Sequence, residues 1–200
     1  MIELVGRDEA VRLLKSGHVI AVPTDTVYGV AAALTHPKAV ANLFTLKRRP
    51  LDAALPVLVD SLAAIEGMGV AWPETANRLS RAFWPGPLTI VVAVDDVLAE
   101  LAGSINQTVG FRIPNNELLL DVLADCGPLG VSSANDHGEP PCHSADEVLS
   151  AFADSAELAG VLDGGVCSGA VSTVVELYDT GWRVLRQGAL SASDIESALA

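Results

Sequence analysis

The chain has 200 residues, half of them hydrophobic, which is a length and composition typical of one compact domain. Its 12 Lys and Arg residues are outnumbered by 25 Asp and Glu residues, and the formal net charge of −13 disfavours a protein that coats nucleic acid nonspecifically. With 18% charged residues, the composition also excludes an intrinsically disordered chain, because enough apolar surface is available to offset the entropy lost on folding.

Membrane and disulfide signals are both weak. No apolar run reaches the 18 residues or so that a membrane span needs, and the first residues lack the basic and apolar regions of a signal peptide. The cysteines Cys126, Cys142 and Cys167 are odd in number and form no C-x-x-C pair, which favours reduced structural thiols over disulfides or a zinc cluster. The sequence therefore predicts a cytoplasmic protein without membrane contact.

The first half of the chain predicts alternating helices and strands. Apolar residues at helical spacing predict helices over residues 8–16, 62–65 and 73–83, and another that Thr35 caps and that ends near residues 47–50. Short apolar and β-branched runs predict strands over residues 18–22, 27–30, 55–59 and 88–94. A polar turn at residues 23–26 interrupts the first apolar run.

The second half predicts strands over residues 108–113, 129–131, 161–162, 172–177 and 183–185, with a hairpin turn at residues 179–181. Helices are expected over residues 118–124 after a cap at Asn115 or Asn116, and after capping boxes that begin at Ser144 and Ser193. We find no repeat and no long linker, so residues 1–200 are expected to form a single mixed-sheet α/β domain.

Two clusters of short polar side chains follow predicted strands, at residues 24–26 and 132–135. Because strand ends of α/β proteins build ligand sites, both clusters are expected to line one pocket. Asp25 could coordinate a cation, but an Asx bond that holds its own turn is the favoured role. The four histidines form no paired ligand set, so the sequence shows no metal signature and leaves any metal ligands unknown.

Basic residues are concentrated at a few positions of this acidic chain. Residues 47–49 read Lys-Arg-Arg and carry a quarter of all basic side chains, at a junction between a helix and a loop. They fit either a favourable charge at a helix C-terminus or a site for polyphosphate oxygens. Arg112 and Arg186 at strand ends could converge on the same site. The chain has no P-loop and no G-x-S-x-G elbow, so any ATP would be bound without the usual cradle.

Six motifs, in this order and at these spacings, resemble the YrdC/Sua5 family over nearly the whole chain: PTDTVYG at 23–29, KRRP at 47–50, WPGPLT at 84–89, RIP at 112–114, SAN at 133–135 and STVV at 172–175. The resemblance implies an open, twisted, mixed β-sheet with flanking helices and a large concave cleft. It also implies a threonylcarbamoyl-AMP synthase, which condenses L-threonine, bicarbonate or CO2 and ATP, and releases pyrophosphate. The product serves the t6A modification of tRNA position 37.

The resemblance assigns roles to individual residues. Lys47 and Arg49 would be catalytic and would hold the ATP phosphates. Further expected ATP contacts are Thr108, Ser133, Asn135, which braces the Ser133 turn, and Arg186. Threonine would be positioned by Thr26, Arg112, Ser172 and the backbone of Val131. Thr24 and Tyr28 would line the cleft wall. Mg²⁺ is expected with the ATP, without a dedicated protein cage.

The chain departs from the longer Sua5-type members in two respects. It carries Ala53 and Leu58 where many of these members have Asn and His, and it resembles the short type without an additional C-terminal domain. The t6A transferase machinery is the expected downstream partner, and direct contact with tRNA is expected to be weak. Two alternatives remain: an RNA-binding module with this fold, and a relative with another carbamoyl or adenylate substrate.

Overall fold

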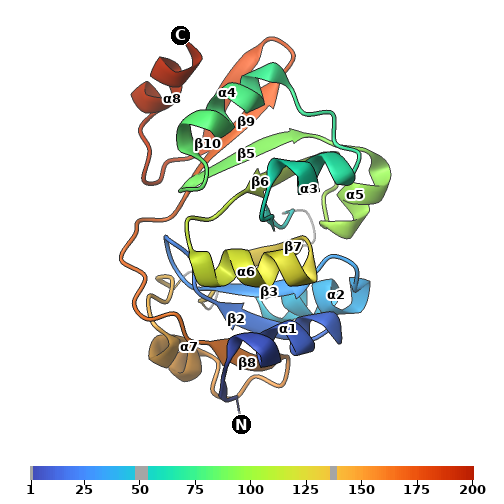
Figure 1. The fold of residues 1–200 in the computed structure, drawn as a ribbon, viewed down its shortest axis with the longest axis vertical. Coiled ribbons are helices and arrows are strands. Elements are labelled where there is room, and N and C mark those ends of the chain that lie inside the picture. Colours follow the sequence, from blue (N-terminus) through green and yellow to red (C-terminus); the bar gives the residue numbers. More distant parts are fainter. Residues whose placement is uncertain (1, 48–53, 136–138) are drawn as a thin grey trace.

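The computed structural model describes residues 2–47, 54–135 and 139–200. Within these residues one mixed sheet runs the length of the molecule, with helices packed on it (Figure 1). Its strands are β1 (Leu4–Val5), β2 (Val19–Val22), β3 (Gly29–Ala33), β4 (Val57–Leu58), β5 (Leu88–Ala93), β6 (Thr108–Arg112), β7 (Leu129–Ser133), β8 (Leu158–Leu162), β9 (Thr173–Tyr178) and β10 (Gly181–Arg186). The helices are α1 (Arg7–Lys15), α2 (Pro37–Leu46), α3 (Leu62–Gly67), α4 (Glu74–Phe83), α5 (Asp96–Leu101), α6 (Glu117–Cys126), α7 (Ala145–Ala151) and α8 (Ala192–Leu199).

The described strands follow the order β1-β8-β2-β3-β7-β4-β6-β5-β9-β10, so the sheet is open, with β1 and β10 at its edges. Parallel pairing joins β1 to β8, β8 to β2, β4 to β6 and β5 to β9, and the remaining neighbours are antiparallel. The predicted fold class, an open mixed sheet with flanking helices, is therefore confirmed.

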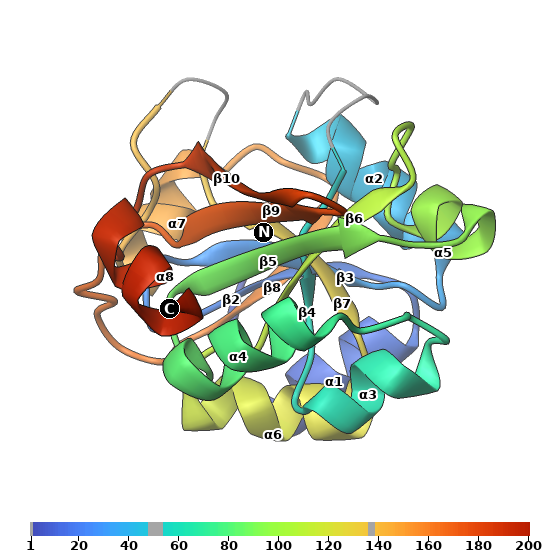
Figure 2. The same cartoon turned by 90° about the horizontal axis from the view of Figure 1, so that it is seen from above.

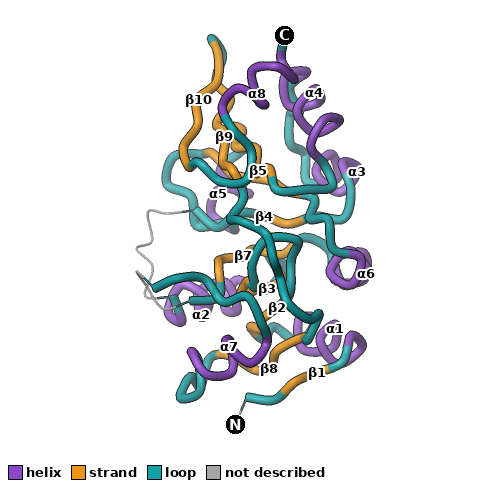
Figure 3. Tube along the Cα trace, turned by 90° about the vertical axis from the view of Figure 1, so that its left-hand side faces the viewer, coloured by secondary structure: helices purple, strands orange, loops and turns teal. Residues whose placement is uncertain are grey.

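Helices cover the sheet unequally. Figure 2 shows α1, α3, α4 and α6 gathered on one face, and the side view in Figure 3 places α2 and α7 on the opposite side. The chain ends lie at opposite ends of the long axis (Figure 1). No helix in the described ranges is long and apolar enough to cross a membrane.

Apolar burial on both faces holds the central strands. Every residue of β2 and β3 is buried, as expected of strands that helices or loops cover on both sides. The larger apolar cluster includes Tyr28, Leu43 and Phe111, and a smaller one includes Leu14 and Leu119 beneath α1 and α6. The fully buried aromatic rings of Tyr28 and Phe111 each remove a large area from water.

Several boundaries differ from the sequence prediction. The structure adds the two-residue strand β1 and the helix α5, which Asp95 caps by accepting a hydrogen bond from Leu98 N. His36 precedes α2 in the place expected for Thr35, whose hydroxyl instead lies 3.0 Å from His36 Nδ1. The capping box of α8 begins at Ser191, two residues before the predicted Ser193, because Asp194 completes it.

Candidate functional site

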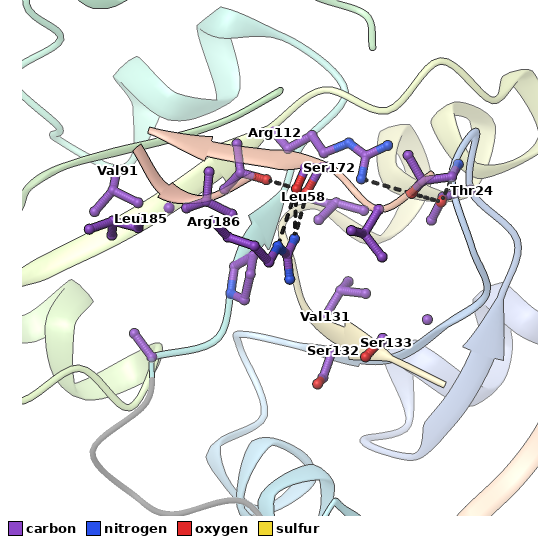
Figure 4. Close-up of a pocket in the computed structure, with 18 of the residues that line it drawn as sticks. Thr24, Leu58, Val91, Arg112, Val131, Ser132, Ser133, Ser172, Leu185 and Arg186 are labelled. Atoms are coloured by element: carbon purple, nitrogen blue, oxygen red, sulfur yellow. Dashed lines mark hydrogen bonds between the residues drawn. The ribbon is translucent and has the colours of Figure 1, made fainter. Parts of the chain in front are cut away.

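The sheet has two halves, one from β1 to β7 and the other from β4 to β10 in the strand order given above. A pocket of about 350 Å³ opens where they meet, and residues of β3, β5, β6, β7, β9 and β10 contribute to its lining. Figure 4 shows its polar groups: Arg112, Arg186 and Ser172 lie above Ser132 and Ser133 of β7, with Thr24 beside them. The residues with a predicted role that line it are Thr24, Thr26, Tyr28, Thr108, Arg112, Val131, Ser133, Ser172 and Arg186. Lys47 and Asn135 are not part of this lining, and Arg49 lies outside the described residues.

The turn between β2 and β3 fixes two threonine hydroxyls. Thr24 Oγ1 accepts hydrogen bonds from the backbone N–H groups of Thr26 (3.0 Å) and Val27 (3.2 Å), and donates its own proton to Val27 O at 2.7 Å. Thr26 Oγ1 lies 2.8 Å from Thr24 Oγ1. The two hydroxyls are therefore within hydrogen-bond distance, and either of them can be the donor of this pair.

Arg112 is buried at the end of β6, with 5% of its surface exposed. Its guanidinium donates from Nε to Gly86 O (3.0 Å), from Nη1 to Thr26 Oγ1 (3.1 Å) and from Nη2 to Asp25 Oδ1 (2.5 Å). Burial lowers the pKa of Arg112, and the negative charge of Asp25 opposes this shift. An arginine side chain keeps its proton in proteins, so the group remains a cation at neutral pH.

The role expected for Asp25 is corrected by its contacts. In place of a local Asx bond, its Oδ1 accepts from Arg112 and from the backbone N–H of Asn115 at 3.1 Å. These donors lie about ninety residues further along the chain, so a long-range ion pair has taken the place of the local turn bond.

Arg186 reaches the pocket through an irregularity in β10. The register of β10 against β9 shifts between Val184 and Arg186, and such a bulge re-aims the side chain that follows it. Arg186 Nη2 donates to Ser172 O (3.0 Å) and Ser172 Oγ (2.9 Å), as the dashed lines in Figure 4 show. Burial lowers the pKa of its guanidinium. Its positive charge also acts on Arg112 and lowers the pKa of that residue further.

Two guanidinium groups therefore line the pocket, and one carboxylate contacts the first of them. Arg112 is paired with Asp25, and no ion pair found among the described residues includes Arg186. Cations that are close together and incompletely neutralised favour a ligand with a negative charge. The hydroxyls of Thr26 and Ser172 beside them add directional hydrogen bonding.

A second polar group adjoins the pocket at the end of β7. Ser133 Oγ donates to Asn135 Oδ1 at 2.7 Å, and Asn135 Nδ2 donates to Glu139 O at 2.6 Å, so Asn135 ties the Ser133 turn to the next loop. The buried Lys47 follows α2 and donates from Nζ to Asn135 O and Oδ1. The structure thus joins three of the predicted ATP contacts in one network.

Tyr28 is part of the pocket lining, and its hydroxyl is hydrogen-bonded to a remote segment of the chain. It donates to Gly165 O at 2.8 Å and accepts from Gly164 N at 3.1 Å, in the segment that follows β8. Burial raises the pKa of Tyr28 to about 12. Tyr28 therefore fastens residues 163–165 to β3.

Sequence reasoning missed Thr89 and the long-range partner of Asp25. Thr89 Oγ1 lies 3.0 Å from Ser172 Oγ, lines the pocket and is buried. Its place in the WPGPLT motif was the available signal, but only the paired strands β5 and β9 show that it meets Ser172.

Comparison with known proteins gives matches over nearly the whole chain. A model of the Sua5/YciO/YrdC family, described as telomere recombination, matches residues 12–188. A Mycobacterium tuberculosis protein is 39% identical over 191 residues, which cover 95% of this chain and 87% of that protein. A Pseudomonas putida protein named threonylcarbamoyl-AMP synthase is 30% identical over 180 residues, which cover 90% of this chain and 96% of that protein.

Solved structures agree with these matches. Pyrococcus abyssi Sua5 complexed with L-threonine superposes with a TM-score of 0.90 at 31% identity; the match covers all of this chain and 61% of that one. Escherichia coli YciO has a TM-score of 0.84 at 20% identity, over 97% of this chain and 98% of that one, which shows a shared fold.

Proposed function

Because this chain belongs to the Sua5/YciO/YrdC family, we propose that it is a threonylcarbamoyl-AMP synthase and that the pocket between the sheet halves is its active site. The observation that carries the proposal is that Arg112, paired with Asp25, and Arg186, bonded to Ser172, line one pocket among hydroxyl groups. That arrangement suits a small anionic amino acid beside a nucleotide. The superposition on a threonine-bound Sua5 supports the same substrate.

Threonine would bind at the Arg112 end of the pocket. Arg112 uses three of its five N–H donors on protein groups, so two stay available for the substrate carboxylate. Thr26 Oγ1 accepts from Arg112 Nη1, and its remaining lone pair would receive an N–H or O–H of threonine. Ser172 and the backbone of Val131 complete this subsite.

ATP would occupy the wider part of the pocket. Thr108 and Ser133 would bond the nucleotide, and Arg186 would meet its phosphate or ribose side from the rim. Lys47, held by Asn135, and Arg49 would contact the phosphates and act as the catalytic cations. We propose that Mg²⁺ accompanies the phosphates, because Mg²⁺ is commonly bound through substrate phosphates.

The proposed chemistry needs no covalent enzyme intermediate. The neutral amine of threonine attacks CO2, a C–N bond forms, and one amine proton leaves to solvent as the carbamate appears. A carbamate oxygen then bonds to the α-phosphorus of ATP while the bond between the α-phosphorus and the bridging oxygen breaks, and pyrophosphate departs. Catalysis would come from positioning and from cations that stabilise the negative charge of the phosphoryl group.

The same proposal covers the cellular setting. The carbamoyl adenylate is a reactive mixed anhydride, so a transferase that acts on tRNA must consume it, in the t6A pathway that the family serves. Bicarbonate would supply the CO2. We propose a cytoplasmic enzyme in which residues 1–200 act as a single catalytic domain.

The test is to incubate the purified protein with ATP, L-threonine and bicarbonate, and to measure pyrophosphate together with the adenylate product by mass spectrometry. We expect pyrophosphate release that requires both threonine and bicarbonate. Parallel reactions replace threonine with L-serine, or replace threonine and bicarbonate with carbamoyl phosphate. Release that is independent of threonine, or that occurs with carbamoyl phosphate alone, contradicts the proposal and favours a relative with another substrate.

A further inference from the structure

Asp25 has no assigned role in the reaction and is not part of the pocket lining, yet its carboxylate contacts Arg112, which is. Its side chain is 13% exposed and contacts Nη2 of Arg112 at 2.5 Å. We propose that Asp25 is a positioning residue, which orients the Arg112 guanidinium for the carboxylate of the substrate. This inference rests on the proposed function.

The first argument is geometric. The guanidinium of Arg112 is held in three directions, by Gly86 O, Thr26 Oγ1 and Asp25 Oδ1. Asp25 is the charged acceptor among these three, and charge-assisted hydrogen bonds are about twice as strong as neutral ones. Two-pronged recognition of a carboxylate requires a guanidinium fork whose plane is fixed. Loss of Asp25 would leave two neutral acceptors to set that plane.

The second argument concerns the position of Asp25 itself. Its Oδ1 also accepts from the backbone N–H of Asn115, in the segment between β6 and α6. The backbone of Asp25 is pressed by Gly169, where an added Cβ would lie 2.4 Å from Asp25 O. Asp25 is thus held by contacts of its own that do not involve Arg112. This is the arrangement expected of a positioning group.

The third argument is electrostatic. Arg112 is almost fully buried, and the positive charge of Arg186 already acts on it. Without Asp25, Arg112 would be a buried cation without a charged partner and still under the repulsion of Arg186, which is strongly unfavourable. With Asp25 present, two cations and one carboxylate leave a net positive charge for the ligand. Asp25 thus keeps Arg112 in place without cancelling the attraction for an anionic substrate.

The experiment compares Asp25→Ala and Asp25→Glu with the wild type, through the Michaelis constants for threonine and for ATP in the pyrophosphate assay. We expect Asp25→Ala to raise the threonine constant roughly 10- to 100-fold, because misplacement of a binding group by about 1 Å has effects of that size. The ATP constant should change by less than about twofold. Asp25→Glu keeps a carboxylate within reach of Arg112 and should recover most of the threonine affinity.

Asp125→Ala is the matched control, since it removes an ion pair of the same 2.5 Å length, to Arg7, on the surface and outside the pocket lining. It should leave both constants unchanged. If Asp25→Ala does not fold, Asp25→Asn takes its place, because it keeps the side-chain shape but loses the charge. The inference is overturned by a threonine constant within twofold of the wild type, or by threonine and ATP constants that rise together.

A second readout does not depend on the reaction. The ¹⁵N–¹H signal of Arg112 Nε, assigned through its absence in Arg112→Lys, should exchange slowly with solvent in the wild type because Gly86 O holds it. Asp25→Ala should accelerate that exchange at least tenfold, and unchanged exchange contradicts the positioning role. Wild-type protein with slow exchange but without threonine-dependent turnover would refute the proposed function alone.

Discussion

Tyr28 shows how one buried hydroxyl organises the chain around the pocket. The side chain is fully buried, and its hydroxyl contacts both backbone groups of a sharp turn, Gly164 N and Gly165 O. These partners lie about 136 residues away along the chain. Burial disfavours the tyrosinate and raises the pKa of Tyr28 from its ordinary value of 10.0 to about 12. The neutral hydroxyl is therefore the form that the fold requires.

Tyr28→Phe should lower the free energy of unfolding by about 1–3 kcal/mol at pH 8, because two buried backbone groups lose their partner. A folded-state pKa above the unfolded one means that this contribution is complete below about pH 10 and is lost as pH rises through about 12. The difference between wild type and Tyr28→Phe in urea unfolding should shrink by about 1 kcal/mol between pH 8 and pH 11. A difference that is constant over this range would contradict the account.

At the level of single residues, the sequence could predict the orientation of a side chain where that orientation depends only on its own strand. Because side chains alternate between the two faces of a strand, the sequence predicted that Arg112 faces away from Phe111 and Ile113. The structure shows that Arg112 lines the pocket. The sequence could not predict that Asp25 pairs with Arg112, because an Asp in a polar turn is expected to bond within its own turn. Only the sheet order brings Arg112 to it, 87 residues along the chain.

Between β8 and β9 the chain crosses from one half of the sheet to the other, and this connection is packed directly on the turn at residues 23–26. A Cβ at Gly169 would lie 2.4 Å from Asp25 O and 2.9 Å from Thr26 Cα, so both contacts are with backbone atoms that cannot move aside easily. The connection also delivers Ser172 to the pocket. Its close fit thus helps to position the residues of the proposed threonine site.

Gly169→Ala should displace this connection, lower the free energy of unfolding by about 1–3 kcal/mol and raise the Michaelis constant for threonine. Gly67→Ala is the control, since Gly67 ends α3 with nothing within 4 Å of an added Cβ. It should be neutral or slightly stabilising, because alanine favours the helix. Urea unfolding and the pyrophosphate assay measure both effects. Equal behaviour of the two variants would show that the contact at Gly169 is unimportant.

The elements that the sequence predicted well have strong patterns, and those it missed have short ones. Helix α4 has apolar and polar residues on distinct faces, and Asn116 caps α6 by accepting from Leu119 N, as predicted. The strand β1 has two residues and exists only because it pairs with β8, which is remote in sequence. Helix α5 has six residues, too few for a periodic signal to stand out.

Several positive charges of the described residues are placed where a long anion cannot use them together. Arg112 is buried in the pocket, while Arg7, Arg12 and Arg183 on the surface are paired with acidic side chains. Around them the net charge is −13. Screening over about 8 Å at physiological ionic strength confines the repulsion of the outer acidic groups, so a small anion can still enter the pocket.

The same charge distribution predicts that the protein does not hold tRNA by itself. Binding to an RNA backbone depends on several exposed cations that displace counterions, and it weakens steeply with salt. We expect fluorescence anisotropy with labelled tRNA to give a dissociation constant weaker than about 10⁻⁴ M at about 150 mM salt. A micromolar complex at about 50 mM salt that weakens at least tenfold by about 200 mM would contradict this and revive the RNA-binding alternative. Without such a complex, the adenylate must leave the pocket before the transferase uses it.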